Sequence, residues 1–113
     1  MIFGIGTDIV NLERIKNLDS LERFAKKILS EGELEEFKSL TDEKKISFIA
    51  KQFAAKEAFS KALGTGIGKG VKLNEIEILR NENGKPYICI IGNLSNIFND
   101  LGIIKTHVSL SDE

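Results

Sequence analysis

The sequence has 113 residues, of which 42% are hydrophobic and 29% charged, and its formal net charge is -1. These values are typical of one soluble globular domain spanning residues 1–113, and the balanced charge argues against a general nucleic-acid binder. The longest apolar run, residues 88–91, is far too short to cross a membrane. No secretory signal is visible, and the single cysteine, Cys89, cannot form an internal disulfide, so we expect a cytoplasmic protein.

The first predicted element is a strand over residues 2–10. Its alternating pattern places the larger side chains of Phe3, Ile5, Thr7 and Ile9 on one face, and Gly4, Gly6 and Asp8 on the other. Two glycines beside an aspartate leave room for another group to approach that face closely.

Helices are predicted next, beginning near Leu12 behind an Asn11 cap and continuing over residues 21–28 and 30–40. Ser30 and Glu33 fit a capping box for the last of these. The strongest prediction is a helix over residues 42–63, which contain neither glycine nor proline. Thr41 is its expected N-cap, and Gly64 is expected to end it.

The second half of the chain predicts a glycine-spaced loop over residues 64–70, strands over 72–79 and 87–91, and a hairpin turn at Asn83-Gly84. A short helix over 94–99 and a last strand over 105–111 follow. The expected fold is α+β, with an antiparallel sheet, a long central helix, and strands from both chain ends able to share the sheet.

The long helix carries charges where packing residues are expected. Every fourth residue forms a stripe of small side chains at Ala50, Ala54, Ala58 and Ala62, which lets another backbone come close. Glu57 and Lys61 continue a row that begins with apolar residues and borders this stripe. One interpretation is an ordinary i,i+4 surface pair. The other is a half-buried carboxylate that needs a cation.

Magnesium is one such cation, because it takes one or two protein carboxylates and completes its shell with water and phosphate oxygens. Asp8, on the glycine face of the first strand, is the obvious second carboxylate, although an aspartate there could simply lead into a turn. The loop over residues 64–70 fits neither a P-loop nor a dinucleotide fingerprint, and one histidine with one cysteine cannot form a zinc site.

Several segments together resemble one family. They are Gly4-Ile-Gly-Thr-Asp8-Ile-Val, then Phe53-Ala-Ala-Lys56-Glu57-Ala-Phe-Ser-Lys61-Ala-Leu-Gly-Thr-Gly66-Ile-Gly, then Asn83-Gly-Lys-Pro86 and His107-Val-Ser-Leu-Ser. In this order they closely resemble the holo-acyl-carrier-protein synthase family, and the resemblance covers residues 1–111. It implies a phosphopantetheinyl-transferase-like fold that assembles as a homotrimer with active sites at the subunit interfaces.

The resemblance also implies an activity. Members of this family transfer the 4'-phosphopantetheine arm of coenzyme A to a serine of apo-acyl carrier protein, with magnesium, for fatty acid biosynthesis. Adenosine 3',5'-bisphosphate is released. The alternative for this chain is a module that binds coenzyme A and magnesium without turnover, or a scaffold in which the trimer itself is the function.

The family's site residues carry over by position. Asp8 and Glu57 are then the magnesium ligands, Lys61 contacts the pyrophosphate, and His107 is a cleft histidine that contacts phosphate; these four form the expected catalytic set. The expected coenzyme A contacts are Lys44, Lys45, Lys61, Gly64, Thr65, Gly66, Lys85, Pro86 and His107, with Lys44 and Lys45 assigned to the 3'-phosphate. The acceptor of the serine proton stays open among Asp8, Glu57 and a water held by the metal.

A basic stretch indicates a docking surface. From charge alone it is either a solvated helix face or a site for an acidic partner. The resemblance favours the second, with Arg14, Arg23, Lys26 and Lys27 facing the acidic recognition helix of the carrier protein. Two departures from the family stand out. Gln52 replaces a common arginine, so that a phosphate or intersubunit contact is weaker or comes from Lys51. The family also continues beyond the last strand with a turn and another strand, whereas this sequence stops at Glu113.

Overall fold

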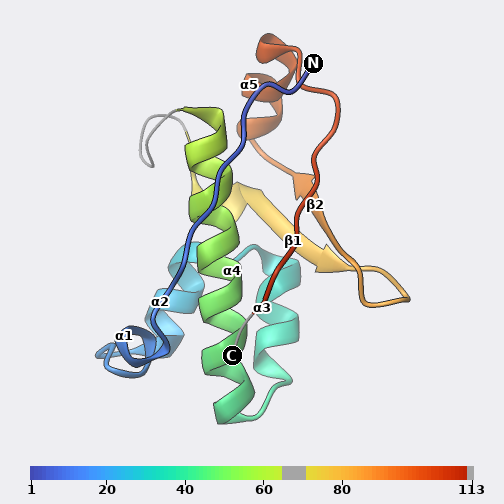
Figure 1. Ribbon diagram of the computed structural model, residues 1–113. Helices are drawn as coiled ribbons and strands as arrows, with labels where there is room; N and C mark the ends of the chain where they lie inside the picture. The colour runs from blue at the N-terminus through green and yellow to red at the C-terminus, as the bar shows by residue number, and fades with distance from the viewer. Residues whose placement is uncertain (65–70, 112–113) are drawn as a thin grey trace.

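The computed structural model describes residues 1–64 and 71–111, and Figure 1 shows how their elements are arranged. In chain order these elements are α1 (Leu12–Lys16), α2 (Leu21–Ile28), α3 (Glu31–Lys38), α4 (Asp42–Leu63), the short 3-10 helix η1 (Leu73–Glu75), β1 (Ile76–Arg80), β2 (Pro86–Ile90) and α5 (Leu94–Leu101). Within this described part, no helix is both long and apolar enough to cross a bilayer.

The helix ends follow the local sequence as predicted. The side chains of Asn11, Ser30 and Thr41 each accept a hydrogen bond from a backbone N–H in the first turn of the helix that follows. Ser30 and Glu33 complete the predicted capping box. Gly64 ends α4 in the left-handed conformation, with φ of 78°, which glycine adopts without steric cost.

Helix α4 passes through two hydrophobic clusters. In one, Ile49 and Ala50 of α4 pack with buried residues of α1, α2 and α3. In the other, Ala55, Phe59 and Leu63 pack against β1 and the start of α5. Helix α4 is therefore the central element: the helices of the first half of the chain lie around its beginning, the hairpin crosses beside its middle, and α5 lies near its end (Figure 1).

The sheet consists of β1 and β2, paired antiparallel with Ile78 opposite Ile88. The predicted hairpin between them is confirmed: Gly84 has φ of 81°, and the Asn81 N–H donates to the Lys85 carbonyl oxygen at 3.0 Å. The predicted strand over 72–79 begins later, at Ile76, because residues 73–75 form η1 instead.

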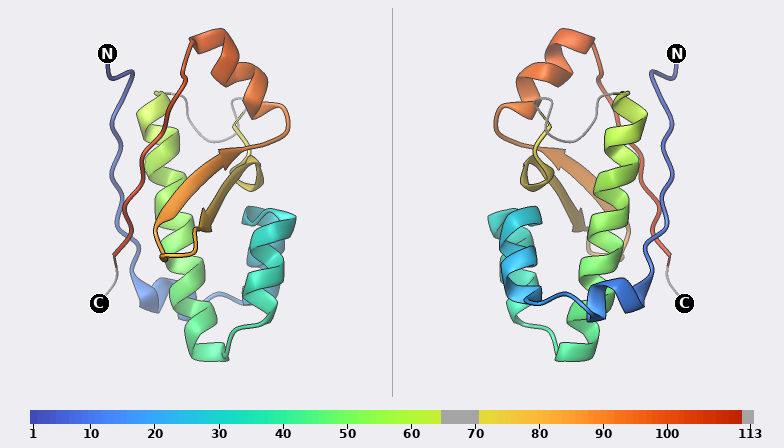
Figure 2. Two further views of the ribbon diagram at one scale, coloured as in Figure 1. Left: turned by 90° about the vertical axis from the view of Figure 1, so that its right-hand side faces the viewer. Right: turned by 90° about the vertical axis from the view of Figure 1, so that its left-hand side faces the viewer.

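The two predicted terminal strands are wrong as sheet strands. Residues 2–10 and 105–111 form no strand, and among the described residues only β1 and β2 are paired. Figures 1 and 2 show both terminal segments running along α4 side by side, and a groove lies between them. Alternation reveals which face of a segment is buried, but a ladder also needs a partner about 4.8 Å away. Neither segment provides that partner for the other.

The N-terminal segment nevertheless contacts α4 as its glycines predict. A Cβ added to Gly4 would lie 1.9 Å from the Ala62 carbonyl oxygen, and one added to Gly6 would lie 1.9 Å from that of Ala58. The predicted close approach of a backbone to the alanine stripe is thus confirmed. This contact places the following residues of the segment, including Asp8, beside the last turns of α4.

Candidate active site

The polar cluster at this contact joins two acids from distant parts of the sequence. The Lys61 ammonium nitrogen donates to Asp8 Oδ1 at 2.8 Å and to the Thr7 carbonyl oxygen at 3.2 Å. Glu57 lies one turn earlier on α4, so the side chains of Glu57 and Lys61 emerge on the same side of this helix. The interpretation of Glu57 and Lys61 as a simple surface pair is wrong, because the ion-pair partner of Lys61 is Asp8.

The charge of Asp8 also acts on Glu57. Partial burial raises the pKa of the Glu57 carboxyl above its ordinary value, and the negative charge of Asp8 raises it further. Lys61 and Arg14 act in the opposite direction, since their positive charges favour the ionised carboxylate. Asp8, Glu57, Lys61 and Arg14 therefore form one cluster of interacting charges, supplied by the N-terminal segment, α4 and α1.

This donor set fits a hard divalent cation. Two carboxylates are the protein ligands that magnesium commonly uses, with water and substrate oxygens completing its shell. Within residues 1–64 and 71–111, no group of three or more His, Cys, Asp and Glu side chains gathers in a way that could hold a metal ion by itself. The structure thus brings Asp8 and Glu57 together as expected, and their role as ligands remains a prediction.

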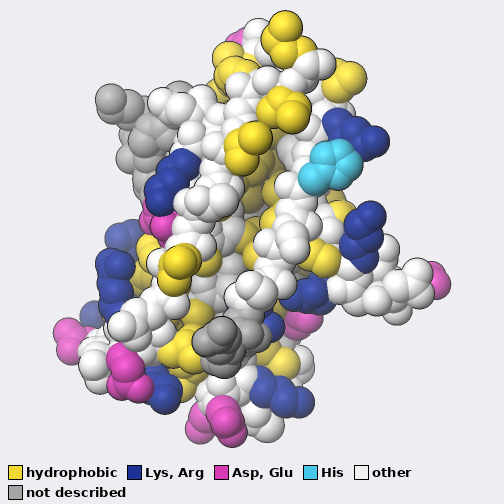
Figure 3. All heavy atoms as spheres, viewed as in Figure 1, with side chains coloured by type: hydrophobic (Ala, Val, Ile, Leu, Met, Phe, Trp, Pro, Cys, Tyr) yellow, Lys and Arg dark blue, Asp and Glu magenta, His cyan; other side chains and the backbone are white. Residues whose placement is uncertain are grey.

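A groove opens beside this cluster. It has a volume of about 870 Å³ and is lined by the N-terminal segment, by α4, and by residues 101–111. Figure 3 shows hydrophobic side chains between the ridges formed by the two terminal segments. Asp8 and His107 both line the groove, and His107 is exposed to solvent. Among the described residues, no hydrogen bond ties His107 to Asp8, Glu57 or Lys61.

Of the two lysines assigned to the 3'-phosphate, only Lys44 lines a second, smaller pocket. Lys44 lines this pocket of about 300 Å³, together with Lys51 and Arg80. Lys45 lies elsewhere, because its ammonium nitrogen is 3.7 Å from Glu22 Oε1 and 5.0 Å from the centre of the Phe37 ring. Lys44 and Lys45 therefore have different surroundings, and their assignment to the 3'-phosphate remains a prediction.

The remaining predicted coenzyme A contacts lie at the end of α4 and in the hairpin. Gly64 is exposed, whereas Thr65 and Gly66 fall outside the described residues. Lys85 is exposed in the turn, and Pro86 begins β2. Arg80 holds this turn in place, because its Nη1 donates to the Gly84 carbonyl oxygen at 2.8 Å.

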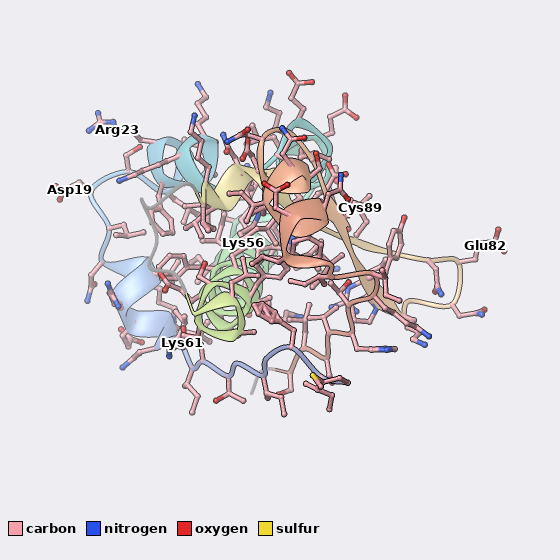
Figure 4. All side chains as sticks on the ribbon, turned by 90° about the horizontal axis from the view of Figure 1, so that it is seen from above. Asp19, Arg23, Lys56, Lys61, Glu82 and Cys89 are labelled. Atoms are coloured by element: carbon pink, nitrogen blue, oxygen red, sulfur yellow. The ribbon has the colours of Figure 1, made fainter. Side chains whose placement is uncertain are left out.

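The predicted docking residues are all exposed. Arg14 lies on α1 close enough to Glu57 to affect its pKa, and Arg23, Lys26 and Lys27 lie on α2. In Figure 4 the Arg23 side chain points outward into solvent. A basic surface therefore borders the cluster of acids and lysine.

A buried ionic network beside this site was not predicted. Glu33 Oε1 accepts from the Lys56 ammonium nitrogen at 2.7 Å and from the Ser30 N–H at 2.9 Å. Its second oxygen accepts from the Gln52 side-chain amide and from the Ile78 N–H. Lys56 also donates to the carbonyl oxygens of Leu73 and Ile76. These bonds connect α3, α4, η1 and β1.

This network is hard to predict from the sequence. Glu33 stands in an acidic run whose other members, Glu31, Glu35 and Glu36, are exposed, so it could not be told from its neighbours. The signal that existed was the capping box, which fixed the position of Glu33 at the start of α3. Gln52 is now explained, since it donates to Glu33 and to the Ile78 carbonyl oxygen in the interior.

The sequence model of the 4'-phosphopantetheinyl transferase superfamily matches residues 4–107, and the chain belongs to this family of enzymes.

Within the superfamily, the chain is similar to holo-[acyl-carrier-protein] synthases. The one from Vibrio vulnificus is 47% identical over 116 residues, covering 99% of this chain and 89% of the relative. The crystal structure of the Neisseria meningitidis synthase has a TM-score of 0.92 at 43% identity, covering 100% of this chain and 90% of that one. The Bacillus anthracis synthase, in complex with CoA (3',5'-ADP), has a TM-score of 0.75 at 44% identity, covering 81% and 78%.

Proposed function

We propose that this chain transfers the 4'-phosphopantetheine group of coenzyme A to a serine of apo-acyl carrier protein, with magnesium, in the cytoplasm and for fatty acid biosynthesis. The observation that carries the proposal is the meeting of Asp8 and Glu57, with Lys61 beside them, in a chain of this family. The similarity to a synthase solved with coenzyme A supports the choice of donor substrate.

Each member of the cluster has a role in holding a diphosphate. Asp8 and Glu57 hold the cation, which when bound supplies positive charge to the phosphate oxygens. Lys61 adds a mobile ammonium group within reach of the same oxygens. Their combined effect is to position the diphosphate and to stabilise negative charge that develops on it, which is the main requirement of phosphoryl transfer.

The reaction forms one bond and breaks one. The serine oxygen of the carrier forms a bond to the β-phosphorus of coenzyme A, and the bond from that phosphorus to the bridging oxygen breaks. Adenosine 3',5'-bisphosphate leaves with this oxygen. The serine proton must pass to a base, for which the Glu57 carboxylate is one candidate. Asp8 and water remain alternatives.

The nucleotide end of coenzyme A is assigned to basic side chains away from the two acids. Lys44 lines a pocket with Lys51 and Arg80, and the exposed Lys85 lies in the turn that Arg80 stabilises. In this pocket Gln52 is committed to Glu33, so the charge that the family's arginine would supply falls to the neighbouring lysines. His107, in the large groove, is assigned a phosphate contact.

The carrier protein is assigned to the surface formed by Arg14, Arg23, Lys26 and Lys27. These side chains are exposed beside the cluster that performs the transfer. Such a surface attracts an acidic partner and guides its serine toward Asp8 and Glu57.

The trimer is proposed for a separate reason. Large apolar side chains of the terminal segments are exposed, including Met1, Ile2, Phe3, Ile5, Ile9 and Ile104. A patch of this kind usually marks an interface, and the groove between the two segments leaves their backbones without ladder partners. Contact between copies of the chain would cover both features and place the active sites at the subunit interfaces.

A single assay tests the proposed function. The chain is mixed with apo-acyl carrier protein, coenzyme A and magnesium, and the carrier is weighed by mass spectrometry. We expect the carrier to gain one phosphopantetheine group, and a chelator to prevent the gain. A module that only binds coenzyme A gives binding without the gain, and a scaffold gives neither.

A further inference from the structure

Lys61 occupies the acid that the proposed function assigns to the metal. Its ammonium nitrogen lies 2.8 Å from Asp8 Oδ1 and also donates to the Thr7 carbonyl oxygen at 3.2 Å. A cation that binds Asp8 must share or take over this oxygen. The ammonium group and the metal are therefore competitors for the same carboxylate.

This ion pair is exposed enough to be broken easily. The Lys61 side chain is 57% exposed and that of Asp8 20%, and ion pairs in contact with solvent stabilise a fold only slightly. Lys56, five residues earlier on α4, makes the opposite kind of pair, because it and Glu33 are both 0% exposed. Figure 4 shows Lys56 and Lys61 on different sides of α4. A lysine also has a flexible four-carbon stem, which lets its ammonium move to a new partner.

The charges around this pair are balanced. Asp8 and Glu57 carry the negative charges, and the positive ones are on Lys61, which bonds Asp8, and on Arg14 of α1, which packs against α4. Without Lys61, the two acids would face each other with Arg14 as the remaining cation of the cluster. Removal of the lysine from Asp8 leaves the acids with excess negative charge, which favours a divalent cation.

We propose that Lys61 is a displaceable counter-ion: it holds the Asp8 carboxylate in place until a divalent cation binds, and its released ammonium then contacts the diphosphate of the substrate. This inference rests on the proposed function and adds the order in which the metal and the diphosphate bind. Divalent cation binding comes first and creates the anion-binding group, so metal and diphosphate bind cooperatively.

The test measures metal binding without substrate. Manganese is titrated into the wild-type chain and into the Lys61→Met, Lys61→Arg and Arg14→Met variants, and free manganese is measured by electron paramagnetic resonance. We expect Lys61→Met to lower the manganese dissociation constant about two- to fivefold, the range that an exposed ion pair allows. Lys61→Arg keeps the pair and stays near wild type. Arg14→Met removes the same charge without releasing Asp8, and gives a smaller change.

A second measurement separates competition from general electrostatics. In calorimetric titrations with coenzyme A at saturating manganese, Lys61→Met should bind the substrate more weakly than wild type, although it binds the metal more tightly. Unchanged or weaker manganese binding in Lys61→Met, or equal tightening in Arg14→Met, would overturn the inference. Circular dichroism of each variant confirms that it is folded.

The outcome for the wild-type chain distinguishes this inference from the proposed function. If the wild type binds manganese and modifies the carrier, a negative result for Lys61→Met rejects only the displaceable counter-ion. If the wild type neither binds manganese nor modifies the carrier, both proposals fail.

Discussion

Lys56 and Glu57 are adjacent in the sequence but belong to opposite kinds of charged site. Lys56 is completely buried, and its ammonium donates to a carboxylate and to two backbone carbonyl oxygens. Glu57 is half-buried at the surface, beside another acid that raises its pKa. The same turn of α4 therefore carries a buried lysine whose hydrogen bonds are satisfied and, toward the solvent, a glutamate that interacts with a second acid.

The difference shows how a charged group can be classified. In the buried network, each oxygen of Glu33 accepts two hydrogen bonds, so little capacity is left for a ligand. Such a network connects elements and fixes the rotation of α4 about its axis. In the exposed cluster, Asp8 is paired with Lys61, whose side chain is 57% exposed, and a cation can reach the carboxylates from the solvent. The first site is structural, and the second is where we place the chemistry.

The largest effect should come from breaking the buried network. Lys56→Met leaves the Glu33 carboxylate buried without its cation, and such losses cost about 3–5 kcal/mol of stability. Urea unfolding measures the change. Lys61→Met, on the same helix, is the matched control and should cost less than about 1 kcal/mol, because its ion pair is exposed. Equal losses of stability in both variants would contradict the difference between a buried and an exposed ion pair.

The second effect should come from moving the N-terminal segment. Gly6→Ala places a Cβ 1.9 Å from the Ala58 carbonyl oxygen, so the segment must shift and carry Asp8 away from Glu57. Misplacement by about 1 Å can lower a transfer rate on the order of 100-fold. The carrier-modification rate measures this. Gly32→Ala is the control, since its Cβ would meet only the end of the Glu77 side chain. If Gly6→Ala has a normal rate, the assignment of Asp8 to the active site is wrong.

A smaller effect is expected at the basic surface. Arg23→Glu should raise the Michaelis constant for the carrier protein severalfold, more strongly at low salt, because the charge reversal repels an acidic partner. The constant for coenzyme A should stay unchanged. Arg14→Glu should act on the carrier in the same way and, since Arg14 also faces Glu57, should affect metal binding as well. If the carrier constant is unchanged in both variants, the surface does not dock the carrier.

The smallest effect concerns Cys89, a half-buried thiol on β2 that belongs to neither charged site. We expect it to be unreactive. Desolvation raises the pKa of its thiol, and the negative charge of Glu77 raises it further. At pH 8 less thiolate is present than in an unstructured peptide, so alkylation by iodoacetamide should be slower. Mass spectrometry over time measures the rate. Alkylation as fast as in the urea-unfolded chain would contradict this description.

Much of the fold followed from local chemistry. The caps of α1, α3 and α4, the end of α4 at Gly64 and the turn at Gly84 depend on a few neighbouring residues, and all were predictable. The close contact of Gly4 and Gly6 with α4 was also foreseeable, because small residues on both sides permit it.

What could not be predicted depends on partners that are distant in the sequence. The terminal segments have the alternation of strands, yet whether they pair depends on what lies beside them in space. The burial of Glu33 depends on Lys56, Gln52 and Ile78, which the acidic run around Glu33 does not reveal. Likewise, Lys61 was in reach of Glu57 by helix spacing, and only the fold shows that it bonds Asp8.

Whether Asp8 and Glu57 hold one ion together is tested most directly by the affinity for manganese in the wild type, Asp8→Asn and Glu57→Gln. We expect one ion per active site in the wild type, and a loss of affinity of at least about 10- to 100-fold in either variant, because both carboxylates hold the same ion. A variant that keeps the wild-type affinity would show that its acid is not a ligand, and would contradict the shared site.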